Sequence, residues 1–361
     1  MKLPGETSPI TLAVWDAYKS AERQAPRRTH LGASEIGKDC TRAIWYSFRW
    51  AYRFEPSGRL LRLFKRGHRE EEWIVNDLRR AGVEVLDLDP KTKKQWAWED
   101  AALGGHFRGS GDGALRNVPG EDPDAWFLAE MKTSNNKAFA SMVDSREGKG
   151  GVRRCRPQHF AQMQIYMGWS GLKRALYIVV NKDNDAYHFE TVDFDQKIFD
   201  QLSERARSIV VAAQPPPKTG TSVESFGCKW CDAKDICHEN KVAAVNCRTC
   251  AHLTAVIDEP GAQWLCERHG LYPTKMQAQR GCDDHLFIPD LIPYAAATDG
   301  GPGWVLYQIR KKDGSGAEFY NADSTSFPPG DAPRMSSKQI RAAAPEEFGE
   351  NGRDVADWDL F

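Results

Sequence analysis

The segment from Trp126 to Lys132 constrains this chain more than any other, because it sets two charged side chains into an apolar run. It reads Trp-Phe-Leu-Ala-Glu-Met-Lys, a composition typical of a buried strand. Successive side chains of a strand point to opposite faces, so Glu130 and Lys132 share one face. Asp112 lies 18 residues before Glu130, within Gly-Ser-Gly-Asp-Gly. Charges buried in a sheet cost free energy, and a divalent metal with an anionic substrate would compensate them.

The composition describes a globular protein. Its 361 residues are enough for one large core or two to three smaller units, and 41% are hydrophobic and 27% charged. No apolar run is long enough to span a bilayer, and the first residues lack the pattern of a signal peptide. We therefore expect a cytoplasmic protein. A net charge of −1 gives no overall attraction to nucleic acid, so the placement of the positive charges matters.

Positive charge is concentrated between residues 38 and 69, where nine Lys or Arg stand against two acids. Aromatic residues are interleaved with them, namely Trp45, Tyr46, Phe48, Trp50, Tyr52, Phe54 and Phe64. This mixture would neutralise phosphates and stack on bases, whereas a solvated basic face over a helical core is the alternative for single residues. A second basic stretch covers residues 146–156. From the two stretches we expect five residues to bind DNA: Arg42, Arg49, Arg66, Arg153 and Arg154.

Periodicity and turn residues predict the remaining elements. Helices are expected at residues 11–25, 60–81, 158–169 and 196–213, with one more that begins at 33–37 and carries Cys40 and Trp45. Strands are expected at residues 83–88, 106–115, 126–132, 175–180 and 186–192, with a hairpin at 304–320. These elements predict an α/β (α+β) fold in which helices flank a central mixed sheet, with a small Cys-rich module added.

A triple proline at residues 215–217 marks a boundary near the end of this pattern. We expect a helical segment (1–30), a main domain (31–240), a Cys-rich module (241–290) and a carboxy-terminal region containing strands (291–361).

The ordered motifs resemble those of the PD-(D/E)xK nuclease superfamily, in particular the RecB-like nucleases, over roughly residues 30–240. The Asp and Glu-x-Lys positions match through Asp112, Glu130 and Lys132. The resemblance implies a restriction-endonuclease-like core, in which both carboxylates bind Mg²⁺ or Mn²⁺ and the lysine assists the attacking water.

Two further motifs flank this core. Gly67 and Glu71 match a Gly-x-x-x-Glu motif on the helix that precedes the sheet, which implies Glu71 as a further metal ligand. His68 is the alternative, because some members use histidine in this motif, although His68 directly follows Gly67. Gln162 and Tyr166 match the downstream Gln-x-x-x-Tyr motif, which implies that both belong to the catalytic site.

Nine cysteines are the second strong pattern, and closely spaced pairs in a cytosolic chain bind metal more often than they form disulfides. Cys228, Cys231 and Cys237, with Cys40 far upstream, resemble the iron-sulfur staple of AddB-type nucleases and CRISPR-associated RecB-like exonucleases. The resemblance implies a 4Fe-4S cluster that closes the domain. Four thiolates also fit Zn²⁺, although a zinc site usually draws its ligands from one local segment.

A second cysteine set follows at Cys247, Cys250, Cys266 and Cys282, and its spacing suggests a zinc ribbon. His269 is an alternative fourth ligand. Reduced thiols without a metal are the other interpretation, and we expect Cys155 to be an ordinary thiol.

The resemblance implies a metal-dependent DNA nuclease. We expect an exonuclease on single-stranded ends, encoded by a phage or mobile element, with a recombination or replication protein as a further partner. No Gly-x-x-x-x-Gly-Lys-Ser/Thr loop is present for ATP hydrolysis. Three alternatives remain open: a trimeric phage recombination exonuclease on duplex ends, a non-catalytic nucleic-acid-binding or adaptor protein with a vestigial nuclease fold, and a virion component.

Overall fold

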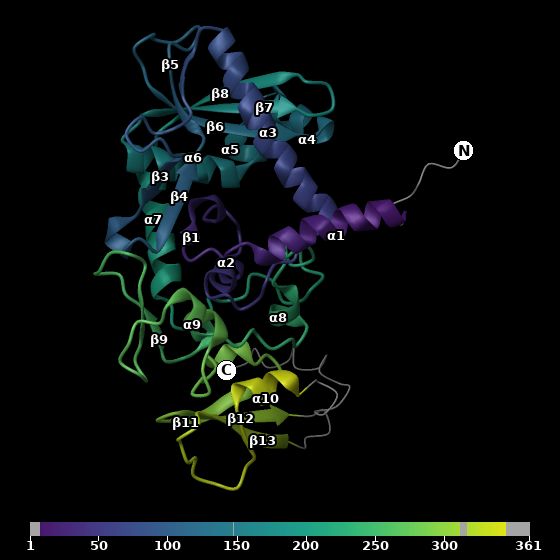
Figure 1. Cartoon of the computed structure of the whole chain (residues 1–361), viewed down its shortest axis with the longest axis vertical. Coiled ribbons are helices and arrows are strands. Elements are labelled where there is room, and N and C mark those ends of the chain that lie inside the picture. The colour runs from purple at the N-terminus through teal and green to yellow at the C-terminus, as the bar shows by residue number, and fades with distance from the viewer. Residues whose placement is uncertain (1–7, 147, 311–315, 344–361) are drawn as a thin grey trace.

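The computed structural model describes residues 8–146, 148–310 and 316–343. A five-stranded sheet with helix α3 (Gly58–Arg80) lies at one end of the molecule, and a four-stranded sheet lies at the other end (Figure 1). Helices α2 (Thr41–Phe48) and α8 (Lys234–His238) lie between the two ends. No helix within the described ranges is long and apolar enough to cross a membrane.

The five-stranded sheet has the order β2-β5-β6-β7-β8. Its strands are β2 (Glu84–Leu86), β5 (Gly113–Arg116), β6 (Phe127–Ser134), β7 (Arg174–Asn181) and β8 (Tyr187–Asp193). Strand β6 pairs antiparallel with β5 and parallel with β7, so the sheet is mixed, as expected. Strands β6 and β7 lie inside the sheet, which explains why both are buried along most of their length.

Two helices cover opposite faces of this sheet. On one face, Phe127 and Met131 of β6 share a buried cluster with Ile74 and Leu78 of α3. On the other face, Leu128 packs into a larger core that includes helix α6 (Pro157–Ser170). Strand alternation therefore turns Glu130 toward α6, the side opposite to the apolar face of α3.

Local signals set the ends of both helices. The Ser57 hydroxyl accepts a hydrogen bond from the Leu60 amide at 3.2 Å and caps the start of α3. Helix α6 begins at Pro157 and ends at Ser170. The next residue, Gly171, has a φ of 78°, the left-handed conformation that glycine adopts without strain.

Three smaller sheets complete the fold. The order β1-β4-β3 joins β1 (Leu31–Gly32), β4 (Phe107–Gly111) and β3 (Trp96–Glu99). Strands β9 (Leu253–Ala255) and β10 (Trp264–Cys266) form an antiparallel pair. The four-stranded sheet contains β11 (Ala296–Gly301), β12 (Trp304–Arg310), β13 (Gly316–Ala322) and β14 (Arg334–Met335).

The remaining elements connect these sheets. The α-helices are α1 (Pro9–Gln24), α4 (Asn136–Met142), α5 (Val152–Cys155), α7 (Gln196–Val211), α9 (Lys275–Arg280) and α10 (Ser337–Ala342). The 3-10 helices are η1 (Ala33–Glu35), η2 (Ala101–Leu103), η3 (Cys247–Thr249) and η4 (Pro289–Leu291). One buried cluster extends from Leu31 to Ile340, so the carboxy-terminal sheet shares its core with the amino-terminal half.

The sequence predicted most of these elements, including the hairpin now seen as β12 and β13. Two predictions were wrong. The expected helix from residue 33 is two helices, η1 and α2, and Cys40 is the residue before α2. The expected strand at 106–115 is split at Asp112 into β4 and β5, which belong to different sheets.

Candidate active site

Glu130 and Lys132 form the centre of the candidate site. Glu130 is completely buried, and its Oε1 lies 2.6 Å from Lys132 Nζ. At this distance the Lys132 ammonium is the partner of Glu130 Oε1, and the two groups form a buried ion pair. Burial raises the pKa of Glu130 to about 7, although the charge of Lys132 opposes this effect. Burial lowers the pKa of Lys132, but the charges of Glu130 and Asp112 outweigh it and raise that pKa overall.

Asp112 lies close to this pair because it stands between β4 and β5, where the chain passes from one sheet to another. Its Oδ2 accepts a hydrogen bond from the Met131 amide at 2.7 Å and lies 3.5 Å from Lys132 Nζ. Gly113, with a φ of 149°, makes the change of direction. A Cβ there would lie 2.9 Å from the Leu86 carbonyl oxygen, so glycine is needed at this position.

Helix α3 brings Glu71 to the same place. Burial raises the pKa of Glu71, and the charge of Asp112 raises it further. His68 lies 3.6 Å from Glu71, but its side chain is 78% exposed. The structure therefore gathers Glu71 with the two carboxylates, and it leaves His68 at the outer edge.

Helix α6 supplies Gln162 and Tyr166 from the facing side. Gln162 Nε2 donates to Glu130 Oε2 at 3.2 Å and to the Tyr166 hydroxyl at 3.5 Å. The Tyr166 ring packs against the backbone of Gly109, where a Cβ would lie 2.4 Å from a ring carbon. Both motif residues thus contact either the site or the strand that leads to it.

Two residues near the site were missed in the sequence. His159 Nδ1 and the Tyr177 hydroxyl lie 2.7 Å apart. Burial lowers the pKa of His159 to about 3, with further lowering by the charge of Lys132. Helical spacing offered a signal for His159, which precedes Gln162 by three residues. Tyr177 is the register partner of Glu130, and that register could not be read from the sequence.

The residues present suit a hard divalent cation. Three carboxylates lie near one another, because the charges of Asp112 and Glu71 both act on Glu130. Carboxylate oxygens are the ligands that a hard divalent cation prefers. Across the described ranges, no three His, Cys, Asp or Glu side chains already stand at the spacing of metal ligands. Small side-chain movements would therefore have to accompany metal binding here and at the cysteine sets below.

Candidate cysteine centres

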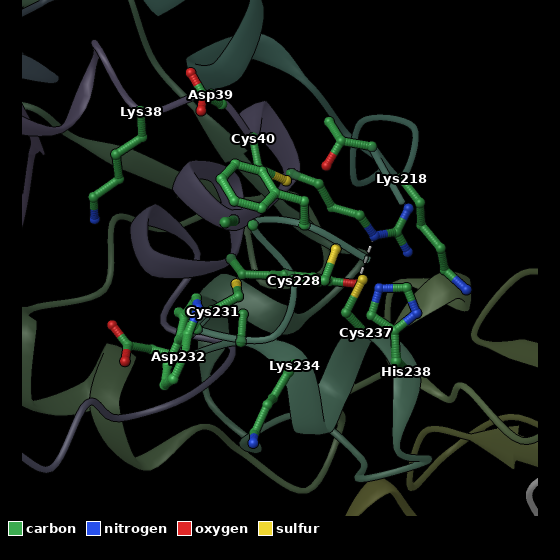
Figure 2. Close-up of a pocket in the computed structure, with 18 of the residues that line it drawn as sticks. Lys38, Asp39, Cys40, Lys218, Cys228, Cys231, Asp232, Lys234, Cys237 and His238 are labelled. Atoms are coloured by element: carbon green, nitrogen blue, oxygen red, sulfur yellow. Dashed lines mark hydrogen bonds between the residues drawn. The ribbon is translucent and has the colours of Figure 1, made fainter. Parts of the chain in front are cut away.

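The first cysteine set lines one cavity of about 350 Å³, in which Cys40, Cys228, Cys231 and Cys237 lie together (Figure 2). All four are free thiols. Burial raises the pKa of Cys231 and of Cys237, and the charge of Cys40 adds to both effects. Four thiols in one cavity are the ligand set of a 4Fe-4S cluster and of Zn²⁺ alike.

Arg205 of α7 holds the loop that carries Cys40. Its guanidinium donates to the carbonyl oxygens of Ile36 at 2.8 Å and Lys38 at 2.6 Å. A long-range contact therefore fixes the loop before Cys40 against α7.

The second set surrounds a void of only about 10 Å³, which is lined by Cys247, Cys250, Cys266 and Cys282. That volume is close to the space that one water molecule or ion needs. Cys250 Sγ accepts a hydrogen bond from the Leu286 amide at 3.4 Å. Burial raises the pKa of Cys247 to about 11 and that of Cys250 to about 12, so proton loss would require a compensating cation.

His269 stays an alternative ligand of the second set, because its Nε2 lies 3.9 Å from Cys282 Sγ. It also lies 3.3 Å from an Asp284 carboxylate oxygen. Cys155 lies outside both sets, and its thiol donates to the Ser141 carbonyl oxygen at 3.2 Å.

Basic residues and comparisons with known proteins

The structure corrects the expected DNA contacts of Arg42 and Arg49. Arg49 is 3% exposed and donates to the carbonyl oxygens of Leu253 at 3.1 Å and Ala212 at 2.9 Å. Arg42 is also buried, and it donates to Tyr46 and to the Pro216 carbonyl oxygen. These guanidinium groups join distant segments of the fold.

The expected base-stacking role was wrong for four of the aromatic residues in this stretch. They are buried in the structure: Trp45, Tyr46, Phe48 and Trp50. Arg153 and Arg154 are exposed, and Arg66 is half-buried and donates to the Lys182 carbonyl oxygen at 2.9 Å. These three arginines stay candidates for DNA contact.

No protein-family model and no curated protein matches this chain. Among solved structures, SSO0001 is 14% identical, with a TM-score of 0.36 over 63% of this chain and 96% of that chain. The alkaline exonuclease LHK-Exo from Laribacter hongkongensis is 15% identical, with a TM-score of 0.33 over 54% of this chain and 90% of its own. The same enzyme in complex with dAMP is 15% identical and has a TM-score of 0.35 over the same shares. Likenesses this distant do not establish an activity, so the function is inferred from the site.

Proposed function

We propose that this chain is a metal-dependent DNA nuclease of the PD-(D/E)xK superfamily, of the RecB-like kind. The observation that carries the proposal is that a carboxylate oxygen of Asp112 and one of Glu130 lie 3.5 Å and 2.6 Å from the Lys132 ammonium. Three charges gathered at a sheet are costly without a ligand, and the same three groups serve phosphodiester hydrolysis.

Asp112, Glu130 and Glu71 would hold Mg²⁺ or Mn²⁺. When bound, such an ion lowers the pKa of its water and neutralises charge on the phosphate. Lys132 supplies a fixed positive charge, which orients the attacking water or stabilises the charge that develops in the transition state.

Helix α6 keeps these groups in place. The Gln162 amide holds one oxygen of Glu130 and leaves the other directed at Lys132. Tyr166 supports Gln162, and the contact between His159 and Tyr177 fixes the neighbouring strand. Helix α6 therefore holds the metal-binding carboxylate of Glu130 in position before the substrate binds.

The first cysteine set supports an iron-sulfur nuclease. We propose that Cys40, Cys228, Cys231 and Cys237 hold a 4Fe-4S cluster, with Zn²⁺ as the alternative, and that the cluster closes the domain formed by residues 31–240. The second set, Cys247, Cys250, Cys266 and Cys282, would hold one Zn²⁺. Both centres need reduced thiols, which the cytoplasm maintains.

The proposed substrate is single-stranded DNA with free ends. The test incubates iron-replete protein with end-labelled linear single strands, linear duplexes and circular single strands, in Mg²⁺, in Mn²⁺ or in a chelator. We expect metal-dependent loss of the linear single strand, with the circle resistant. If no DNA were degraded with either metal, the nuclease assignment would be overturned; if circles were cut, an endonuclease would replace the exonuclease.

A further inference from the structure

We propose that the mouth of the cysteine cavity, formed by Phe226, Trp230 and the lysines around them, binds the single-stranded DNA that the active site would cut. This inference rests on the proposed nuclease function and deepens it, because it names the surface that holds the strand. Two exposed rings, a set of cations and a shared helix support it.

The two aromatic rings lie at the surface although apolar residues of this size are usually buried. Phe226 is fully exposed, Trp230 is 81% exposed, and both line the cavity. Gly227 follows with a φ of 89°, so a sharp turn presents Phe226 outward. Bases stack on exposed aromatic rings with little regard to sequence, which suits a surface that guides any single strand.

Cations line the same cavity. Lys38, Lys218 and Lys234 line the cavity, and Figure 2 shows them on different sides of the cysteines. Besides the buried Arg42, the lining contains three lysines against two acids, and Lys38 pairs with Glu35 at 2.9 Å. Lys229 adds a further ammonium 5.8 Å from the centre of the Trp230 ring. An excess of positive charge next to flat apolar faces complements a polymer of phosphates and bases.

Helix α6 connects this surface to the active site. Gln158 lines the cavity, and Gln162, one turn later, donates to Glu130. One helical turn rises about 5.4 Å, so these two glutamines lie about that far apart along the axis of α6. A Cβ at Gly37 would lie 2.7 Å from the Cα of Gln158, which shows how closely the loop before Cys40 packs on this helix.

The test measures binding in a Glu130→Gln background, so that DNA stays intact. The probe is a fluorescent oligothymidylate of about 20 nucleotides, a length that covers more than one stacking site. Replacing both rings, Phe226→Ala with Trp230→Ala, should weaken binding at least about ten-fold. The matched control is Phe327→Ala, which removes a ring that is 88% exposed in the segment after β13 and should leave affinity unchanged.

The lysines have a separate readout. Lys218→Ala with Lys234→Ala should reduce the slope of log affinity against log salt by about 0.7 for each lost contact. Phe226→Leu keeps apolar bulk without a ring and should weaken binding, while Trp230→Phe keeps a ring and should preserve it. Iron and zinc content is measured for each variant, so that loss of a cysteine centre is distinguished from loss of stacking.

Unchanged affinity in the double alanine variant and in Phe226→Leu would overturn the proposal. If the double alanine variant lost its metal, the DNA affinity of the Phe226→Leu protein alone would decide whether the proposal stands. Should wild-type protein fail to cut DNA while the ring variants lose binding, the nuclease function would fall and the binding surface would stand. If wild-type protein cut DNA while the ring variants bound it normally, the nuclease function would stand and the binding surface would fall.

Discussion

The side-chain amide of Gln162 donates to Glu130 at 3.2 Å, which couples a helix to the central strand at the most buried carboxylate of the candidate site. The contact holds one oxygen of Glu130 and leaves the second facing Lys132. Gln162 thus acts on the proposed reaction through the position of Glu130.

Gln162→Leu should therefore lower kcat about 10- to 100-fold with little change in DNA affinity, because a misplaced carboxylate slows the chemical step. Single-turnover cleavage and equilibrium binding measure the two effects separately. Gln164→Leu is the matched control, since it also removes a buried amide from α6, but one that donates to the Asp193 carbonyl oxygen. Equal loss of kcat in both variants would contradict a positioning role for Gln162.

Gly109 should tolerate no side chain. Gly109→Ala would place a Cβ 2.4 Å from the Tyr166 ring, and we expect a loss of about 1–3 kcal/mol in the free energy of unfolding. At Gly67, inside α3, a Cβ would meet nothing within 4 Å, so Gly67→Ala should stabilise by up to about 1 kcal/mol. Urea denaturation of both variants measures the contrast, and an unharmed Gly109→Ala protein would show that Tyr166 does not need this close contact.

His106 should make the fold sensitive to mild acid. Burial lowers its pKa to about 4, and its Nε2 lies 2.9 Å from the Gln263 carbonyl oxygen. The unfolded chain binds a proton at this position near pH 6.5, before the folded protein does, so stability falls as the pH drops from about 6.5 toward 4.

His106→Gln retains a donor for the carbonyl oxygen but does not titrate. Between pH 7 and pH 5, the loss of unfolding free energy should be smaller in this variant by about 2 kcal/mol. Urea denaturation at both pH values gives the comparison. An identical loss in wild type and variant would mean that His106 does not contribute to acid sensitivity.

The two cysteine sets should load different metals. Protein purified without oxygen should contain about four iron atoms per chain and absorb near about 400 nm, together with about one zinc. Cys237→Ser should remove iron and retain zinc, and Cys250→Ser should do the opposite. Zinc alone, in both sets, would retain two metal centres but exclude the iron-sulfur cluster.

The central features of the site could be predicted because they depend on local patterns. Strand alternation placed Glu130 and Lys132 on one face, and helical spacing placed Gln162 and Tyr166 together. The passage of the chain from one sheet to another at Asp112 could not be predicted, because the sequence from Gly109 to Gly113 is compatible with one continuous strand. Long-range packing near β4, such as the contact between Trp98 and Tyr166, is visible only in the structure.

The basic stretch shows the limit of counting charges. Arg49 looks like a phosphate ligand in the sequence, yet carbonyl oxygens from residues more than 160 positions away satisfy its guanidinium in the core. Only the tertiary fold shows whether an arginine is matched inside the protein or left for a ligand. The same holds for Phe226 and Trp230, whose exposure no sequence pattern indicated.

The most direct test compares DNA cleavage by wild-type protein and Glu130→Gln under Mg²⁺ or Mn²⁺, with Glu84→Gln as the control. Glu84 is a partly exposed carboxylate that pairs with Arg116 at 2.6 Å, away from the candidate site. We predict that Glu130→Gln loses at least about 100-fold in cleavage rate while Glu84→Gln stays active. Equal degradation of DNA by wild type and Glu130→Gln would contradict the assignment of Asp112, Glu130 and Lys132 as the catalytic site.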